Sequence, residues 1–367
     1  MTPRSVVLKI GSNALVGGDG RIDQVFLASL AAQVATVRAA GWRAAIVTSG
    51  AVASGVARLG LDRRPPGLAE RQALAAIGQI GLVHRWESAL AAQGVVAAQL
   101  LLTHDDFTER ERYLNLCATV DALVAFGAVP VINENDPIAV QELTVGDNDR
   151  LSALIAAQLG ADRLVLLTDI DGVYDADPRT HPQAKRLEII PAVTPSVLAA
   201  AGDASARGRG GMRSKLEAAR LAAGAGVTTH IALARAENIL PRLLADEPVG
   251  TRIPGRGQRA DSRRRWLAVA RKAKGRIHVD AGAVTALTAR GRSLLPAGIT
   301  AVDGRFQRGD TVAILGPEGD ELARGLASLS ADELAKIAGK RLDSAAQLLG
   351  YALPPAAVHR DNLLLLA

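Results

Sequence analysis

Two lysines beside glycines are the residues best suited to chemistry in this sequence. Only seven of the 43 basic residues are lysine, and residues 1–250 hold just Lys9, Lys185 and Lys215. Lys9 precedes Gly11 by two positions, and Lys215 ends the run Gly210-Gly-Met-Arg-Ser-Lys. A lysine ammonium is a compact charge that can neutralise a phosphate oxygen, and glycine turns expose backbone N–H groups to anions. The pair favours phosphoryl transfer, although two ordinary surface lysines are the alternative.

Carboxylates and amides gather in two further runs, Asn133-Glu-Asn-Asp136 and Asp147-Asn-Asp149. Phosphoryl transfer needs reactants held in line and charge neutralised on the transferred group. Asp149 could orient both lysines, and Asp136 and Asn148 could bind the ammonium and carboxylate of an amino acid. Asp169 could face a nucleotide or a magnesium ion. For the first run, an Asx-rich turn before Pro137 is the alternative.

Other chemistries lack their signatures in this sequence. There is no G-x-x-x-x-G-K-S/T loop, the six histidines are scattered, and no His/Cys/Glu cluster has metal-ligand spacing. The single cysteine, Cys117, excludes an intramolecular disulfide. Any metal is therefore expected to arrive with the nucleotide phosphates.

The elements that must position these residues alternate along the chain. Buried-strand runs are expected at Ser5–Ile10, Trp42–Val47, Val95–Leu102, from Val129, Leu164–Leu167 and Thr229–Leu233. Helices are expected at Gln24–Ala40, Leu68–Gln93, up to about Phe126, from Leu151, Met212–Ala225 and Glu237–Leu244. Gly78 and Gly81 suggest a soft spot in the second of these helices. The pattern predicts an α/β fold with an open, mostly parallel sheet between helices and a ligand site along one rim.

The pattern changes after residue 250, which predicts a second domain. Residues 251–276 carry ten basic side chains against Asp261 alone, so 251–274 is interpreted as a basic linker. Short strands at Arg276–Val279, Ala297–Val302 and Thr311–Leu315 indicate a small β-barrel within 275–367. A capping box at Ser330-Ala-Asp-Glu333 opens a helix that stops at Gly339.

Composition narrows the setting of the protein. The 367 residues are 49% hydrophobic and 22% charged, which is typical of a globular chain of two domains. No signal-like N-terminus and no apolar run of membrane length are found. The net charge of +6 is concentrated at 251–276, which argues against a polyanion-binding surface over the whole molecule. A reducing, cytoplasmic location without membrane contact is expected.

Taken together, the motifs resemble the glutamate 5-kinase branch of the amino acid kinase family, in the form that has a C-terminal PUA domain. The matching segments are Val7–Ser12, Val47–Ala51, Pro130–Asp136, Val145–Asp149, Leu167–Asp169 and Gly210–Lys215, followed by Gly275–Asp280, Ser293–Ile299, Tyr351 and Val358–Asp361. They cover most of the first domain in the expected order. The Ile-Asn-Glu-Asn-Asp and Val-Gly-Asp-Asn-Asp runs are the most specific.

The resemblance implies ATP-dependent phosphorylation of the γ-carboxylate of L-glutamate, the first step of proline biosynthesis, with Mg²⁺ and with proline as feedback inhibitor. It implies a homo-oligomer, a dimer or tetramer, and contact with the next enzyme of the pathway. The residues carried over are Lys9, Lys215 and Asp149 as catalytic; Ser49, Asn133, Asp136 and Asn148 for glutamate; and Lys9, Gly11, Thr168, Asp169, Arg209, Gly210, Gly211, Met212, Arg213, Ser214 and Lys215 for the nucleotide.

The sequence differs from the family pattern at one loop, and two alternative hypotheses about its function are considered. The phosphate loop of the family usually has the form Thr-Gly-Gly-Met-x-Thr-Lys, so Arg209 and Arg213 add positive charge that could alter nucleotide affinity or its salt dependence. One rival is another acceptor within the same fold, such as N-acetylglutamate, aspartate, carbamate or a nucleoside monophosphate. The other is RNA binding, against which the second domain offers only Phe306 and Tyr351 rather than an interleaved aromatic and basic face.

Overall fold

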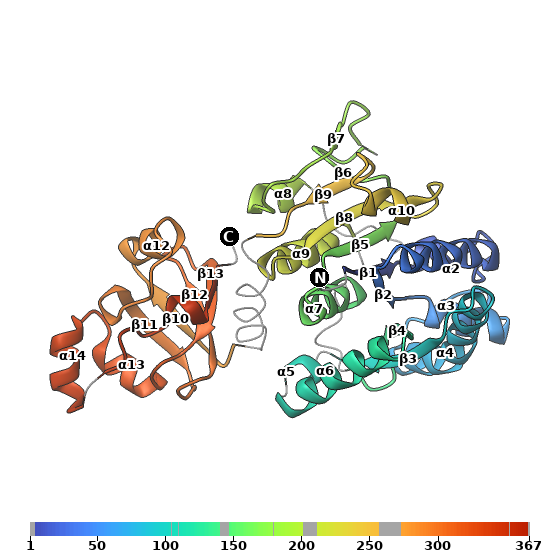
Figure 1. Ribbon diagram of the computed structural model, residues 1–367. Helices are drawn as coiled ribbons and strands as arrows, with labels where there is room; N and C mark the ends of the chain where they lie inside the picture. Colours follow the sequence, from blue (N-terminus) through green and yellow to red (C-terminus); the bar gives the residue numbers. More distant parts are fainter. Residues whose placement is uncertain are drawn as a thin grey trace. The chain divides into compact units, whose positions relative to one another are not determined.

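Alternating strands and helices form the first of two units in the computed structural model, and a smaller sheet forms the second (Figure 1). The structure describes residues 4–103, 105–108, 110–139, 147–178, 180–200, 211–256, 273–351 and 353–365. The units are Met1–Arg256 and Gly257–Ala367. Among the described helices, none is both long and apolar enough to span a bilayer.

The strands of the first unit are β1 (Ser5–Ile10), β2 (Arg43–Val47), β3 (Ala97–Leu102), β4 (Val129–Glu134), β5 (Arg163–Thr168), β6 (Val173–Tyr174), β7 (Arg186–Leu187), β8 (Thr228–Leu233) and β9 (Thr251–Ile253). Its helices are α1 (Ser12–Leu15), α2 (Gln24–Ala39), α3 (Ala51–Leu59), α4 (Leu68–Ala91), α5 (Asp105–Thr108), α6 (Arg110–Ala125), α7 (Asp147–Leu159), α8 (Pro195–Ala200), α9 (Met212–Gly224) and α10 (Ile239–Leu244).

Seven of these strands form one sheet in the order β3-β4-β2-β1-β5-β8-β9. All neighbouring pairs are parallel except β8 and β9. The chain builds one side of the sheet from β1 to β4 and then returns to build the other side from β5. The strand order therefore switches between β1 and β5, and ligands of open α/β sheets bind beyond the carboxyl ends of strands at such a point. The predicted α/β fold is confirmed.

Side-chain alternation along β1 separates the core from the site. Val6, Leu8 and Ile10 belong to a buried cluster shared with α2, α4 and α10. Because successive strand residues point to opposite faces, Val7 and Lys9 lie on the other face, where α7 contacts β1 and packs on α9. The apolar pattern that builds the core thus also directs Lys9 toward the two helices that carry its partners.

The helix α4 continues without a break through Gly78 and Gly81, where the sequence suggests a soft spot. A Cβ on Gly78 would lie 1.9 Å from the carbonyl oxygen of Ala51 and 2.3 Å from the backbone nitrogen of Gly55. Gly55 likewise leaves no room for a Cβ against the backbone of Leu74. These glycines allow close approach of α3 and α4, which is a packing role rather than a break.

The first unit extends past the predicted domain boundary at residue 250. Residues Thr251–Ile253 form β9, which pairs antiparallel with β8 and closes that edge of the sheet. The segment interpreted as linker, 251–274, therefore begins inside the first unit, which runs to Arg256. The three-residue strand was missed because it is too short to show a period. Residues 257–272, which hold most of the basic run, lie outside the described part of the chain.

The second unit contains β10 (Gly275–Val279), α12 (Ala281–Thr288), η2 (Pro296–Gly298), β11 (Ile299–Gly304), β12 (Thr311–Leu315), β13 (Glu321–Leu326), α13 (Ala331–Ile337), α14 (Leu342–Leu349), η3 (Arg360–Asn362) and β14 (Leu363–Leu365). Its five strands have the order β11-β10-β12-β13-β14. They pair antiparallel except for β10 with β12. Ser330 caps α13 through the expected capping box with Glu333.

Candidate active site

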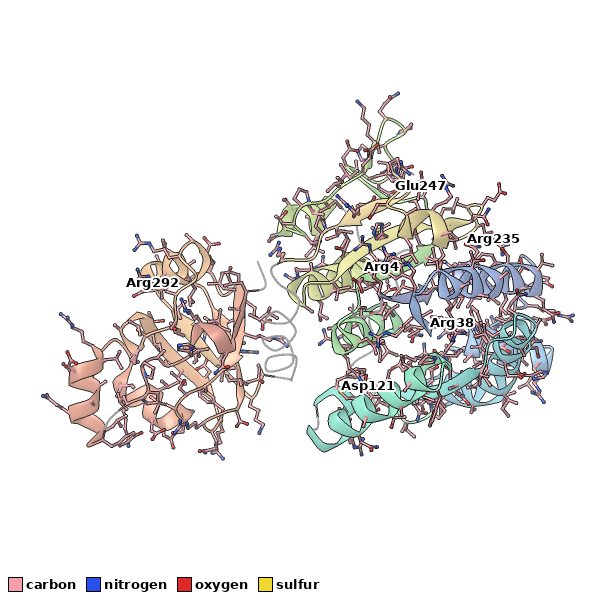
Figure 2. All side chains as sticks on the ribbon, viewed as in Figure 1. Arg4, Arg38, Asp121, Arg235, Glu247 and Arg292 are labelled. Atoms are coloured by element: carbon pink, nitrogen blue, oxygen red, sulfur yellow. The ribbon has the colours of Figure 1, made fainter. Side chains whose placement is uncertain are left out.

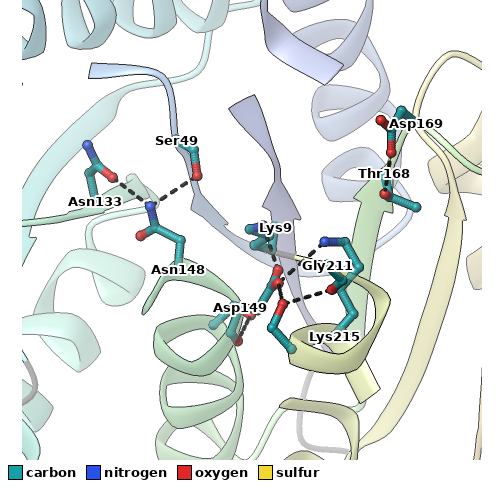
Figure 3. A network of polar contacts seen from close by, with 11 residues as sticks. Lys9, Ser49, Asn133, Asn148, Asp149, Thr168, Asp169, Gly211 and Lys215 are labelled. Carbon is teal, nitrogen blue, oxygen red and sulfur yellow. Dashed lines mark hydrogen bonds and ion pairs between the residues drawn. The ribbon is translucent and has the colours of Figure 1, made fainter. Parts of the chain in front are cut away.

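A buried carboxylate between two lysines forms the centre of the site (Figure 3). Asp149, in the first turn of α7, is 1% exposed, and its Oδ1 lies 2.5 Å from the Nζ of Lys9. Its Oδ2 lies 3.4 Å from the Nζ of Lys215, the fourth residue of α9. The hydroxyl of Ser214 donates to the same Oδ2 at 2.7 Å. One carboxylate therefore holds two cations from two different elements in fixed positions.

Burial and charge act in opposite directions on these groups. Burial would raise the pKa of Asp149, but the charges of Lys9 and Lys215 and the hydrogen bond from Ser214 hold it at about 2. Burial also lowers the pKa of Lys9, an effect that Asp149 opposes and Lys215 reinforces. Asp149 is thus ionised at neutral pH and stands between the amino groups of two lysines, which are groups suited to an incoming anion.

A second group of polar side chains lies beside the first. The Nδ2 of Asn148 donates to the Oγ of Ser49 at 3.0 Å and to the Oδ1 of Asn133 at 3.1 Å (Figure 3). Asn133, at 2% exposure, donates in turn to the Oε1 of Gln79 at 2.8 Å. The structure therefore brings together residues from the ends of β2 and β4 and the start of α7. Asp136 follows β4 and lines the same cleft.

A third group follows β5 on the far side of β1. The hydroxyl of Thr168 donates to Asp169 at 3.0 Å, and the amide of Asn13 donates to the other carboxylate oxygen at 3.2 Å. Burial opposes it, but these hydrogen bonds keep the pKa of Asp169 below its ordinary value. Gly11 and Asn13 follow β1, so this carboxylate and the first glycine turn meet at the switch point of the sheet.

All three groups open on one cleft of about 420 Å³. Of the residues predicted for the site, Lys9, Gly11, Ser49, Asn133, Asp136, Asn148, Asp149, Thr168, Asp169 and Lys215 line it. The cleft has two ends with different chemistry. The lysines lie at its centre, with the amides and Asp136 on one side and Asp169 on the other.

The predicted phosphate loop is only partly within the described residues. Arg209 and Gly210 lie outside them. Gly211 immediately precedes α9, and its carbonyl accepts from the hydroxyl of Ser214 at 2.9 Å. Met212 begins the helix. Arg213 is paired with Glu217 at 3.2 Å, so part of the charge expected beside the phosphates is balanced on the helix itself. Ser214 is engaged with Asp149 rather than lining the cleft.

The sequence analysis missed several residues of the site. Gln79 lies in the middle of a long helix, far from any glycine turn, and nothing in its neighbourhood marks it. Asn13 follows the first glycine turn and could have been included on that ground. Arg63 and Arg64 line the cleft from the loop after α3, where they read as ordinary loop residues.

Arg235 supports the segment after β1 without lining the cleft (Figure 2). From the turn after β8 it donates to Asp23 at 2.8 Å and to the carbonyl of Ala14 at 3.3 Å. Its guanidinium also stacks 4.7 Å from the ring centre of Phe26. These contacts tie α1 and the N-cap of α2 to the other half of the sheet.

Comparison with known proteins shows the family of the chain. The family model described as the amino acid kinase family matches residues 4–233, and the PUA domain model matches residues 275–349. Proteins named glutamate 5-kinase match almost the whole chain. The one from Stutzerimonas stutzeri (strain A1501) is 47% identical and covers 99% of this chain and 98% of its own. The one from Pseudomonas putida (strain W619) is 49% identical, covering 98% and 97%. The one from Deinococcus radiodurans is 46% identical, covering 98% and 99%. The chain belongs to the amino acid kinase family and, within it, to the glutamate 5-kinases.

Proposed function

We propose that this protein transfers the γ-phosphoryl group of ATP to the γ-carboxylate of L-glutamate and forms L-glutamyl 5-phosphate, the first step of proline biosynthesis. The observation that carries the proposal is the buried Lys9–Asp149–Lys215 cluster in a cleft with an amide-rich end. The near full-length similarity to glutamate 5-kinases supports the same acceptor.

In the proposed reaction, a γ-carboxylate oxygen of glutamate attacks the γ-phosphorus of ATP. The new P–O bond forms as the bond to the bridging β,γ-oxygen breaks, and ADP leaves with the electron pair. No proton transfer is needed, because the attacking carboxylate is already ionised at neutral pH. The protein therefore has to align the reactants and neutralise the charge on the equatorial oxygens.

The cleft supplies groups for both tasks. Lys9 and Lys215 approach Asp149 from β1 and α9, so two ammonium groups lie on either side of one fixed point. Because Asp149 holds both, they are in place before the transition state forms, which is the condition for large electrostatic stabilisation. Ser49, Asn133, Asp136 and Asn148 are proposed to bind the amino acid, and Gly11, Thr168, Asp169 and the 209–215 loop to bind ATP.

A magnesium ion is proposed to accompany ATP. No group of three or more His, Cys, Asp or Glu side chains suited to a metal is found among the described residues. Mg²⁺ commonly uses one or two carboxylates together with substrate phosphates, and the carboxylate of Asp169 in the cleft fits that pattern. The ion would supply further neutralisation of phosphate charge.

The test is ATP consumption with magnesium across L-glutamate, N-acetyl-L-glutamate, L-aspartate and UMP, with hydroxylamine present to trap an acyl phosphate. Hydroxamate formation with L-glutamate alone is the expected result. Turnover of a different acceptor would retain the lysine cluster and overturn the assignment of the acceptor. Suppression by added proline in the same assay tests the proposed feedback inhibition, and the assay on cytoplasmic extract tests the proposed location.

A further inference from the structure

Gln79 is connected to the proposed substrate end of the cleft although it does not line it. It lies on α4 next to Gly78, the glycine that lets this helix pack closely on α3. Its side chain reaches a neighbouring cavity of about 400 Å³ that Glu134 and Asp136 also line. Its Oε1 accepts the 2.8 Å hydrogen bond from the Nδ2 of Asn133. Gln79 is therefore the outer end of a chain of amides that leads into the active site.

Each amide in this chain fixes the orientation of the next. Because Gln79 presents an acceptor, Asn133 must turn its nitrogen toward Gln79 and its oxygen toward Asn148. Asn148 must then turn its nitrogen toward Asn133, where the same nitrogen also reaches the hydroxyl of Ser49. An amide nitrogen has two hydrogens, so both donors of Asn148 are used.

What Asn148 can still offer is its oxygen alone. This Oδ1 is buried and has no hydrogen-bond partner among the residues that the structure describes. A buried acceptor without a donor is costly, and such a group calls for a ligand or another partner. A carboxylate of the substrate could not satisfy it, since a carboxylate has no hydrogen to donate. An ammonium group could.

We propose that Gln79 is a positioning residue that sets the polarity of the Gln79–Asn133–Asn148 chain, so that Asn148 offers an acceptor to the ammonium group of the amino acid substrate. The proposal rests on the proposed function, because it assigns one group of the acceptor to one residue of that site. The polarity is carried by the two amide hydrogen bonds, from Asn133 to Gln79 at 2.8 Å and from Asn148 to Asn133 at 3.1 Å.

The test compares L-glutamate with glutarate, which lacks the amine, in the hydroxamate assay on the full-length protein. Gln79→Met keeps the length and helix propensity of the side chain but removes the acceptor. Gln79→Glu keeps an acceptor, and Gln79→Lys replaces it with donors alone. Gln99→Met is the matched control, because Gln99 lines the same small cavity but is outside the amide chain.

Gln79→Met is expected to raise the KM for L-glutamate about tenfold, from the loss of one oriented buried hydrogen bond, while kcat and the KM for ATP stay within about threefold. The KM for glutarate should not change, because glutarate makes no use of the acceptor. Gln79→Lys should raise the glutamate KM at least as much. Gln79→Glu and Gln99→Met should resemble the wild type.

Three results would overturn the proposal. The first is an unchanged KM for L-glutamate in a folded Gln79→Met or Gln79→Lys variant, and the second is a KM for glutarate that rises as much as the KM for L-glutamate in these variants. The third is a raised ratio of the glutamate KM to the glutarate KM in Gln79→Glu. If the wild type instead phosphorylates another amine-bearing acceptor, the proposed function fails, and the same variants are compared on that acceptor and its deaminated analogue. Preference of the wild type for an acceptor without an amine would overturn the positioning role as well.

Discussion

The two units of this chain differ in the burial of their charged side chains. In the first unit, Lys9, Asp149 and Lys215 are 4%, 1% and 5% exposed and belong to one cluster. In the described part of the second unit, the buried polar residue is Thr311, and the ion pairs Lys274–Asp310, His278–Asp303 and Arg324–Glu321 have side chains between 21% and 62% exposed. Among the residues that the structure describes, the buried Lys, Arg, Asp and Glu side chains are Lys9, Asp149 and Lys215 of the proposed active site.

The difference reflects what each arrangement costs. Taking three ionic groups out of water is expensive, and hydrophobic residues of similar volume often stabilise a core more than a buried ion pair does. In the described part of the second unit, α13 has a capping box and the charge pairs are exposed or half-buried. In the first unit, the buried ionic groups are Lys9 near the end of β1 and Asp149 and Lys215 in the first turns of α7 and α9. A local departure of this kind is typical of a functional site.

The largest expected effect comes from removing one cation of the cluster. Lys215→Ala should lower kcat for the proposed reaction by at least about 10²-fold, because a preorganised group that stabilises transition-state charge is lost. Glutamate binding should be largely intact. Steady-state kinetics and calorimetric titration of glutamate measure the two separately.

The matched control is Lys274→Ala, which removes a lysine paired with an aspartate at 2.8 Å on the surface of the second unit. It should leave kcat unchanged. Equal loss of binding and turnover in Lys215→Ala would mark Lys215 as a ground-state contact and weaken the contrast between the two units.

The next effect concerns stability. Asp149→Asn removes the charge that separates two buried lysines, and breaking a buried ionic arrangement in this way costs about 3–5 kcal/mol. Asp303→Asn removes an exposed partner of His278 and should cost less than about 1 kcal/mol. Urea unfolding followed by circular dichroism compares the variants. Similar midpoints for both would show that the buried cluster contributes no more than a surface pair.

A third prediction concerns the helix pair beside the cleft. Gly78→Ala places a methyl group 1.9 Å from a backbone oxygen of α3, which cannot move as a side chain can, so a loss of about 1–3 kcal/mol or more is expected. Gly81→Ala meets the end of the Arg85 side chain at 2.9 Å and makes an ordinary contact with the Oγ of Ser54 at 3.5 Å, so it should gain up to about 1 kcal/mol in helix propensity. Thermal unfolding distinguishes them. If Gly78→Ala and Gly81→Ala changed the stability equally, close packing on α3 would not explain Gly78, and a soft spot in α4 would again be the explanation.

Much of the fold could be predicted from the sequence, because its strands are continuous apolar runs that end in glycine or polar turns. Ser5–Ile10 and Leu164–Leu167 were found for this reason. The edge strand β9 was not, because three residues show no period. The role of Gly78 was not either, since close helix packing depends on a partner helix that the local sequence does not reveal.

Some residues of the site could likewise be predicted from the sequence, and others could not. Lys9, Asp149 and Lys215 stand at strand ends and helix starts, where position alone suggests function, and the structure brings them together. Gln79 acts through a hydrogen bond to a residue 54 positions away, so only the fold shows it. The orientation of an amide chain is a property of the whole chain of contacts and cannot be inferred from any one of its residues.

The smallest expected effect comes from removing a helix cap in the second unit. The hydroxyl of Ser330 accepts from the backbone nitrogen of Glu333 at 3.4 Å, while the carboxylate of Glu333 accepts from the backbone nitrogen of Ser330 at 2.8 Å. Ser330→Ala removes the N-cap of α13 and should cost about 1 kcal/mol. Since neither Ser330 nor Glu333 lines the cleft, kcat and both KM values should be unchanged, as measured by the hydroxamate assay beside thermal unfolding. A change in kcat in this variant would mean that the second unit acts on the active site. The contrast drawn between the two units, with catalysis assigned to the first alone, would then be wrong.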